Sequence, residues 1–553
     1  MIFQRFFALV FVGVIGCSGT LSAETHYDVV LQSGRVMDPE TGFDAVRNVG
    51  VIDGRIAIIT ADTLSGTREI DAKGLVIAPG FIDTHFHSMD EFATRMALRD
   101  GVTSGMDLEA GAYNVKQWYA DKKDQWQINY GVTASHLLHR MKIMDAEVEI
   151  SGPVDATNAK AYLNKAALDG KPSWSIERAN SEQMNAIVKN VDNELKEGAL
   201  GVGLGLAYAA RGATSYEVFE VQKAASRYSR LASVHTRYHL DASAPTEAPI
   251  AFDEVFTNAM LLDAPLLLAH NNDYGWEENE EKLQMARARG LNMWSEFYPY
   301  TAGSTFVSAD FLRPEIFVDK FGFRYEDTLY SPEQDKFLTR AEYDTMVEKT
   351  PGTFVVAFMP PRKKWMNHWL HMPHMTVASD GMQGVGTDGK LLPWDADFSA
   401  YAGHPRTAGA RAKTLRLARE QGVPLMQTLS QLSYWSAKHL GDAGIESMKE
   451  RGRVQVGAVA DLTLFDPKVV SDQATYKAGE NGRPSTGIYW VLVNGDVVVE
   501  NSTVQQDIRS GQPIRYPVEA RGRYEAFDAV SWLKKHGVDA ESVDDNSSVS
   551  HLH

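Results

Sequence analysis

The sequence predicts an α/β protein in which a closed (β/α)8 barrel is combined with a small β-sandwich domain formed by both chain ends. The 553 residues exceed the length over which one hydrophobic core usually grows, so more than one domain is expected. Short apolar runs alternate with helical stretches through the middle of the chain, a pattern typical of βα units and a parallel sheet. A barrel with insertions fits this span of about 360 residues better than an open sheet, although periodicity alone does not separate the two.

Both ends of the chain have β patterns. Apolar residues alternate from Val49 to Ile58 around Asp53 and Gly54, which form a two-residue hairpin signal. Asp461–Phe465 and the stretch 491–498 repeat this style near the other end. We therefore predict a signal peptide at residues 1–23, a β-sandwich domain from 24–79 and 441–505, a barrel from 80–440, and a C-terminal extension from 506–553 with a frayed polar end.

The segment Ser181–Leu195 illustrates the repeating unit of the barrel. Its apolar residues recur at helical spacing, and Gly198 and the apolar run Leu200–Leu206 follow, which predicts a helix and then a strand. Residues from about 306 to 353 interrupt this rhythm with aromatic, proline and charged clusters. We interpret this stretch as an insertion on the catalytic face of the barrel.

The N-terminus has the layout of a secretory signal peptide. Arg5 precedes the apolar run Phe6–Gly16, and small and polar residues follow up to Ala23. The run is too short to span a bilayer as a permanent helix, so no transmembrane span is predicted. We expect an exported protein, periplasmic or secreted. The residues before Cys17 also resemble a lipobox, which leaves a membrane-anchored lipoprotein as the alternative.

Charge and cysteine content exclude several classes of function. The formal net charge of −17 repels phosphate backbones, so nucleic acid is not expected as a partner. A small anionic substrate stays compatible with this charge, because a local arginine or metal can reverse the field in one pocket. Cys17 is the only cysteine, so disulfides and cysteine ligands play no part in the catalytic portion.

Two histidines follow a short apolar strand near residue 80. The run from Gly74 ends in His85 and His87, one residue apart. Side chains at positions i and i+2 of a strand point to the same side, so both imidazoles can converge on one metal ion. Imidazole suits zinc and related borderline metals.

Four segments resemble known families. Residues Pro79–His87 resemble the first-strand signature of the amidohydrolase superfamily. Residues Tyr298–Thr305, His404–Arg406 and Arg451–Leu462 resemble segments of the N-acyl-D-amino-acid deacylases within it, a group that includes D-aminoacylase and N-acyl-D-glutamate deacylase. The similarity covers most of residues 27–505. It implies a distorted (β/α)8 barrel with a β-sandwich built from both ends.

The resemblance also implies roles for single residues. His235 and His270, each at the end of an apolar run, match two metal ligands of the family, which add to His85 and His87. Asp380 matches the catalytic aspartate, suited to take a proton from a metal-activated water and pass it to the leaving amine. Three positions resemble substrate contacts: Tyr298, Ser304 and Tyr208.

The chain departs from its relatives at two positions. Relatives place a metal-binding cysteine where this chain has Ala110, so we predict that the adjacent Glu109 bridges the metals, with Asp107 as the alternative. Many relatives carry a substrate-binding lysine where this chain has Asn272. Arginine binds carboxylates in a bidentate fork, and the candidates to replace that lysine are Arg237, Arg406 and Arg211, of which Arg237 is included among the predicted substrate contacts.

The expected function is metal-dependent hydrolysis of the amide bond of an N-acyl-D-amino acid, which releases a carboxylate and a free D-amino acid. The expected cofactor is Zn²⁺, one or two ions, with another divalent metal left open. Two alternatives stay open. One is a different amidohydrolase reaction, such as cyclic-amide or dipeptide hydrolysis, because one fold hosts many chemistries. The other is a non-catalytic metal-binding or ligand-binding protein of the periplasm.

Overall fold

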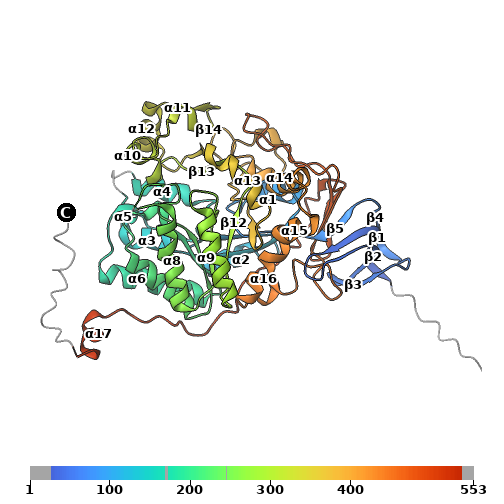
Figure 1. The fold of residues 1–553 in the computed structure, drawn as a ribbon, viewed down its shortest axis with the longest axis horizontal. Coiled ribbons are helices and arrows are strands. Elements are labelled where there is room, and N and C mark those ends of the chain that lie inside the picture. The colour runs from blue at the N-terminus through green and yellow to red at the C-terminus, as the bar shows by residue number, and fades with distance from the viewer. Residues whose placement is uncertain (1–25, 168–171, 245, 538–553) are drawn as a thin grey trace, which may run out of the picture.

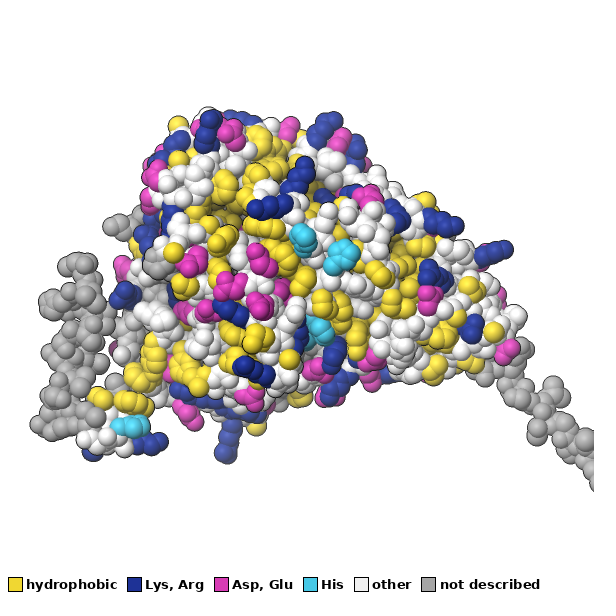
Figure 2. Space-filling model, viewed as in Figure 1, with side chains coloured by type: hydrophobic (Ala, Val, Ile, Leu, Met, Phe, Trp, Pro, Cys, Tyr) yellow, Lys and Arg dark blue, Asp and Glu magenta, His cyan; other side chains and the backbone are white. Residues whose placement is uncertain are grey.

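The computed structural model describes residues 26–167, 172–244 and 246–537 (Figure 1). The predicted signal peptide, Cys17 and the polar C-terminal end lie outside these residues. Within them, no helix is both long and apolar enough to cross a membrane. Figure 2 shows acidic and basic side chains interspersed over the face in view, and the molecule tapers toward the end that carries the N-terminal strands.

Eight parallel strands form the predicted barrel. They follow one another in chain order as β6 (Phe81–Asp83), β7 (Val102–Ala112), β8 (Asn129–Ser135), β9 (Gly201–Gly205), β10 (Leu231–His235), β11 (Leu266–Leu268), β12 (Met293–Phe297) and β17 (Met375–Val377). The first and last strands approach each other just beyond their ends, where Phe86 pairs with Gly381 and the Ser379 amide donates to Asp83 at 3.1 Å. The sheet is therefore nearly closed, and the predicted fold is confirmed.

Helices surround the barrel and connect its strands (Figure 1). The principal ones are α1 (Glu91–Arg99), α2 (Val115–Lys122), α3 (His136–Met144), α6 (Ser181–Lys196), α7 (Ser215–Ser226), α8 (Ala248–Leu262), α9 (Trp276–Ala288) and α14 (Arg406–Gln421). Shorter ones are α4 (Ala159–Ala167), α5 (Ser173–Ile176), α13 (Met366–Trp369), α15 (Leu425–Leu429) and α16 (Trp435–Asp442). Helix α17 (Ala529–Lys535) follows the last strand and lies apart from these helices, at the lower left of Figure 1. Helix α6 matches the predicted segment, and it begins with a capping box between Asn180 and Gln183.

Strands from both chain ends share one nine-stranded sheet. The N-terminal strands are β1 (Tyr27–Asp38), β2 (Phe43–Ile52), β3 (Arg55–Thr60), β4 (Gly66–Asp71) and β5 (Val76–Pro79), and the C-terminal ones are β18 (Leu462–Phe465), β19 (Ile488–Val493), β20 (Asp496–Glu500) and β21 (Thr503–Val504). Antiparallel pairing of β5 with β18 joins the two ends. Asp53 and Gly54 turn the β2–β3 hairpin with φ of 50° and 74°, as a type I′ turn requires. The exact domain limits stay predictions.

A separate four-stranded sheet interrupts the barrel between β12 and β17. It contains β13 (Ala302–Phe306), β16 (Phe354–Phe358), β14 (Leu329–Ser331) and β15 (Lys336–Phe337), with α10 (Pro314–Phe317), α11 (Tyr325–Thr328) and α12 (Arg340–Lys349) packed around it. We call residues 302–358 the insertion; its first and last strands extend beyond the predicted range of 306–353. In Figure 1 it stands above the barrel, at the top of the view.

The opposite end of the barrel is closed by the segment that follows β21. The Ile514 amide donates to the Tyr130 carbonyl at 2.7 Å, near the start of β8. The Ile514 side chain is buried with Leu200, Leu231 and Leu267, which lie at or beside the beginnings of β9, β10 and β11. Polar side chains and a pocket therefore lie at the C-terminal ends of the strands, as in other barrels of this kind.

Candidate metal centre and active site

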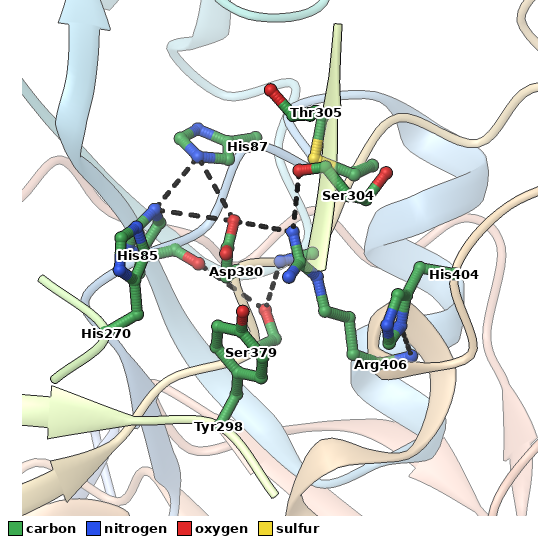
Figure 3. Close-up of polar contacts among 12 residues, drawn as sticks. His85, His87, His270, Tyr298, Ser304, Thr305, Ser379, Asp380, His404 and Arg406 are labelled. Carbon is green, nitrogen blue, oxygen red and sulfur yellow. Dashed lines mark hydrogen bonds and ion pairs between the residues drawn. The ribbon is translucent and has the colours of Figure 1, made fainter. Parts of the chain in front are cut away.

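His85 and His87 lie just beyond the end of β6 with their rings turned toward one point (Figure 3). Their Nε2 atoms are 3.0 Å apart, and both side chains are buried. Two imidazole nitrogens this close, away from water, are suited to share a metal ion. The structure thus brings together the pair that the His-x-His spacing predicts.

Two carboxylates lie beside the Nδ1 atoms of these rings. Glu296, on β12, lies 2.6 Å from His85 Nδ1 and also accepts a hydrogen bond from Thr84, while Asp107, on β7, lies 2.9 Å from His87 Nδ1. Each carboxylate fixes the orientation of its ring and leaves Nε2 free for a ligand. Asp107, the alternative bridge, therefore faces a ring and not the centre. Glu296 is not among the residues predicted from the sequence, where its signal is a lone carboxylate within the apolar run of β12.

Glu109 lies between two groups of histidines. One oxygen is 3.0 Å from His235 Nδ1, and the other is 3.5 Å from His85 Nε2 and 3.4 Å from His87 Nε2. The pairing of β7 with β8 is irregular between Asp107 and Ala112. Such an irregularity changes the direction in which the side chains of this part of the strand point. Burial alone would raise the pKa of Glu109, but the three histidines outweigh it and lower the pKa well below its usual range.

His235 and His270 complete the second group. His235 is the last residue of β10, and His270 follows β11 with its Nε2 3.1 Å from His235 Nδ1. His270 has a φ of 31°, a conformation that residues other than glycine adopt rarely and that is often found at functional sites. His239, which sequence analysis missed, lies 3.1 Å from His235 Nε2. Burial and the neighbouring His235 lower the pKa of His239 well below its usual value.

Asp380 faces the first pair of histidines from beyond β17 (Figure 3). Its Oδ1 lies 3.5 Å from His85 Nε2, 3.6 Å from His87 Nε2 and 2.8 Å from Arg406 Nη2. Asp380 has a φ of 49°, a left-handed conformation that Asp adopts in turns before glycine. This turn places its carboxylate beside the histidines, and strained backbone of this kind is often found at functional sites. The predicted position of the catalytic aspartate is thus next to the predicted ligands.

The donor set fits a metal centre with two adjacent positions. The donor atoms of His85, Glu109 and His270 lie within 4.8 Å of one another, as do those of His85, His87 and Asp380. The two groups share His85. Buried carboxylates and imidazoles without cysteine suit a borderline cation, whose charge would offset those of Glu109 and Asp380.

A pocket opens in front of these donors, with an empty volume of about 830 Å³ that includes its open mouth. The other predicted contacts Tyr208, Tyr298 and Ser304 line it, as do residues of the insertion. Arg362, which sequence analysis missed, lines it as well and donates from Nη1 to the Tyr298 hydroxyl at 2.5 Å. Its sequence signal is weak, because it is one of three consecutive basic residues after two prolines.

The predicted substrate contact Arg237 does not line this pocket. Its guanidinium binds Glu254 in a bidentate pair at 2.7 and 3.0 Å, so its side chain is directed into the neighbouring helix layer. Arg211 pairs with Asp310 at 2.9 Å. A strand-end position alone does not determine where a long side chain points, and a carboxylate one helix away captures Arg237.

Asn272, at the place of the relatives' lysine, supports the pocket indirectly. Its side chain donates to the Tyr298 carbonyl at 2.9 Å and accepts from the Tyr298 amide at 3.3 Å. Asn272 is fully buried and serves the backbone of a pocket residue.

A nearly closed barrel with buried histidines and carboxylates at its strand ends is the arrangement expected of a metal-dependent hydrolase of the barrel class. Residues 68–256 match the family model described as "Amidohydrolase family". The chain is 27% identical over 502 residues to D-aminoacylase of Alcaligenes xylosoxydans xylosoxydans, covering 85% of this chain and 94% of that one. It is also 27% identical over 493 residues to N-acyl-D-glutamate deacylase of the same organism, with 85% and 93% covered.

Solved structures agree in fold. A crystal structure of D-aminoacylase superposes with a TM-score of 0.67 at 21% identity, covering 89% of this chain and all of that one. The N-acyl-D-glutamate deacylase of Bordetella bronchiseptica, complexed with zinc and a phosphonate inhibitor, gives 0.68 at 22% identity, with the same coverage. The predictions of the fold, of the resemblance and of an amidohydrolase enzyme are confirmed.

Proposed function

We propose that this chain is a zinc-dependent N-acyl-D-amino-acid deacylase that releases a carboxylate and a free D-amino acid. The observation that carries the proposal is Glu109, which lies between two histidine groups that share His85, with Asp380 beside them. The substrate class comes from the relatives, which are named for D-aminoacylase and N-acyl-D-amino-acid deacylase activities. The substrate is accordingly a small molecule.

The metal would be held by His85, His87, Glu109, His235 and His270, with Asp380 beside them. Zinc held by such donors would supply a Lewis acid for the scissile carbonyl and would lower the pKa of a bound water. Asp380 is placed to accept the proton of the attacking water and to pass it to the leaving nitrogen. Its ion pair with Arg406 fixes the carboxylate in this position.

Tyr298 is placed to donate to the scissile carbonyl oxygen. Burial raises the pKa of Tyr298, so the phenol keeps its proton. Because its oxygen already accepts from Arg362, the hydroxyl hydrogen is directed away from Arg362 and is available to the substrate. A donor aimed at the developing oxyanion typically contributes about 10²–10³-fold to the rate.

The test is a screen of the purified zinc-loaded protein for release of free amine. The substrates are N-acetyl-D-amino acids, their L enantiomers, dipeptides and hydantoins, and the Asp380→Asn protein is the matched control. We expect hydrolysis of the N-acetyl-D-amino acids in preference to the L forms. Equal or reversed stereochemical preference, or turnover of hydantoins or dipeptides alone, would assign a different amidohydrolase reaction. No turnover of any of them would indicate a non-catalytic protein.

We also propose that the protein is exported, on the strength of Arg5 and the apolar run Phe6–Gly16. Fractionation of cells that express the full chain tests this by the location of the protein. Cleavage after Ala23 predicts a soluble periplasmic or secreted form that a Cys17→Ser change leaves unaltered. Recovery with membranes that is lost in Cys17→Ser would favour the lipoprotein alternative.

A further inference from the structure

The first and last strands of the barrel are joined mainly by side chains. Strands β6 and β17 are the two ends of the eight-stranded sheet, and among the described residues one backbone bridge connects them, between Phe86 and Gly381 beyond the strand ends. Arg411, on α14, spans the remaining gap, because its Nη2 donates to the carbonyls of Ile82 at 3.3 Å and of Val377 at 3.2 Å. One buried guanidinium thus binds the backbone of both strands.

Asp83, the last residue of β6, lies at the centre of this connection. Its Oδ1 accepts from the amides of His85 at 3.2 Å and Ser379 at 3.1 Å. Its Oδ2 accepts from the Ser379 hydroxyl at 2.5 Å and lies 2.9 Å from Arg411 Nη1. The side chain is fully buried, so a carboxylate with these four contacts is held in one geometry. We call Asp83, Ser379 and Arg411 the seam network.

The seam network lies directly beside two predicted groups of the centre. His85 is a predicted metal ligand, and Ser379 precedes Asp380 in the turn after β17 (Figure 3). Ser379 Oγ also accepts from the Gly381 amide at 2.9 Å, so both neighbours of Asp380 in the chain are held by the network. Asp83 therefore fixes the backbone on both sides of the gap between His85 Nε2 and Asp380 Oδ1, which are 3.5 Å apart.

Helix α14 supplies the cations for both carboxylates. Arg406 pairs with Asp380 at 2.8 Å, and Arg411, five residues later, pairs with Asp83. In a regular α-helix, side chains five positions apart point about 140° away from each other. Helix α14 has non-helical backbone at Gly409, between the two arginines. The break changes this relation, and one helix binds the carboxylates of both strand ends.

We propose that Asp83 and Arg411 are positioning residues, which set the distance between His85 and Asp380 across the seam of the barrel. The inference rests on the proposed function, in which Asp380 accepts a proton beside the metal held by His85. Neither Asp83 nor Arg411 lines the pocket, so both act through these two residues and not on the substrate. A displacement of about 1 Å between reacting groups can lower a rate by about 100-fold, so a small opening of the seam is measurable.

The test compares two buried ion pairs at opposite ends of the barrel. Asp83→Asn removes the charge from the seam network, and Asp461→Asn removes it from the pair with Arg451, which is also buried and also 2.9 Å long. With saturating zinc, Asp83→Asn should lower kcat for N-acetyl-D-leucine by about 30–100-fold and leave KM nearly unchanged. Asp461→Asn should lower thermal stability and leave kcat unchanged while the protein is folded. An equal loss of kcat in both variants would show that Asp83 only supports the fold, and the inference would be overturned.

A double-mutant cycle identifies the group through which Asp83 acts. In the Asp380→Asn background, Asp83→Asn should lower kcat by less than about threefold, because the proton acceptor that it positions is already absent. Full additivity of the two changes would overturn the inference. Arg411→Lys keeps a cation but lacks the planar fork, so it should restore part of the rate that Arg411→Met loses. Equal kcat in these two variants would contradict the role of the ion pair.

Two measurements without turnover separate the inference from the function on which it rests. The visible absorption bands of the cobalt-substituted protein depend on the geometry of the metal ligands, and Asp83→Asn should shift them whereas Asp461→Asn should not. A crystal structure of zinc-loaded Asp83→Asn should place His85 Nε2 and Asp380 Oδ1 further apart than in the parent protein. Unchanged bands and an unchanged distance would overturn the inference even in an active enzyme. If both shifts occur but the parent protein hydrolyses no substrate, the proposed function fails and the positioning role stands.

Discussion

Replacing Glu109 by alanine is expected to lower metal occupancy and activity together. Glu109 is 4% exposed, and its oxygens lie 3.0–3.5 Å from ring nitrogens of His235, His85 and His87. Removing one partner from a buried set of charges typically costs about 3–5 kcal/mol. Since about 1.4 kcal/mol is a tenfold change in a binding constant, we expect the affinity for the metal beside Glu109 to fall by at least ~100-fold.

The assay equilibrates the variants in zinc-buffered solutions and measures zinc per chain by elemental analysis, together with turnover of N-acetyl-D-leucine. Glu109→Gln keeps the shape and removes the charge, so it should resemble Glu109→Ala if the charge is what matters. Glu446→Ala is the control, because that glutamate is exposed and far from the centre in the fold. Full zinc content and full rate in Glu109→Ala would refute the bridging role and place the bridge elsewhere.

Three further changes test other parts of the centre. Asp380→Asn should lower kcat by at least ~100-fold with zinc content nearly intact, because the amide cannot accept a proton; a variant that instead loses its zinc would make Asp380 chiefly a ligand. Glu296→Gln should weaken zinc binding about 10–100-fold, measured by competition with a chromogenic chelator, because His85 loses its anionic partner; unchanged affinity would contradict that role. Removal of metal by a chelator should abolish turnover and added zinc should restore it; full turnover after elemental analysis confirms metal loss would exclude a metal-dependent reaction.

The convergence of the predicted metal donors could be predicted because the fold fixes where the strand ends lie. In a parallel barrel the ends of all strands meet at one rim, so histidines that follow separate apolar runs converge although they are far apart in the chain. His85, His235 and His270 are such residues. Glu109 was predicted to face the metals from its position two residues before Gly111 in the same strand. The pairing of β7 is irregular at this place, between Asp107 and Ala112.

The residues that support and extend the centre could not be predicted in the same way. Glu296 acts on His85, which is 211 positions away, and a carboxylate in an apolar strand has no local pattern that names its partner. Arg362 is bound by Asp273, 89 positions away, whereas Arg237, which stands two residues after the predicted ligand His235, pairs with Glu254. The direction of a long side chain depends on which opposite charge lies within reach, and only the packed structure determines that.

The arrangement of the pocket separates the chemistry from the choice of substrate. The predicted metal donors belong to the barrel strands and the turns that follow them, whereas Phe306, Phe311 and Phe354 belong to the insertion, which has its own sheet and its own buried cluster around Phe317 and Tyr325. Substitutions of these three phenylalanines therefore change the lining of the pocket without displacing a predicted metal donor. Tyr208 is the exception, because it contacts both His235 and the insertion. A change at that residue is expected to affect rate and selectivity together.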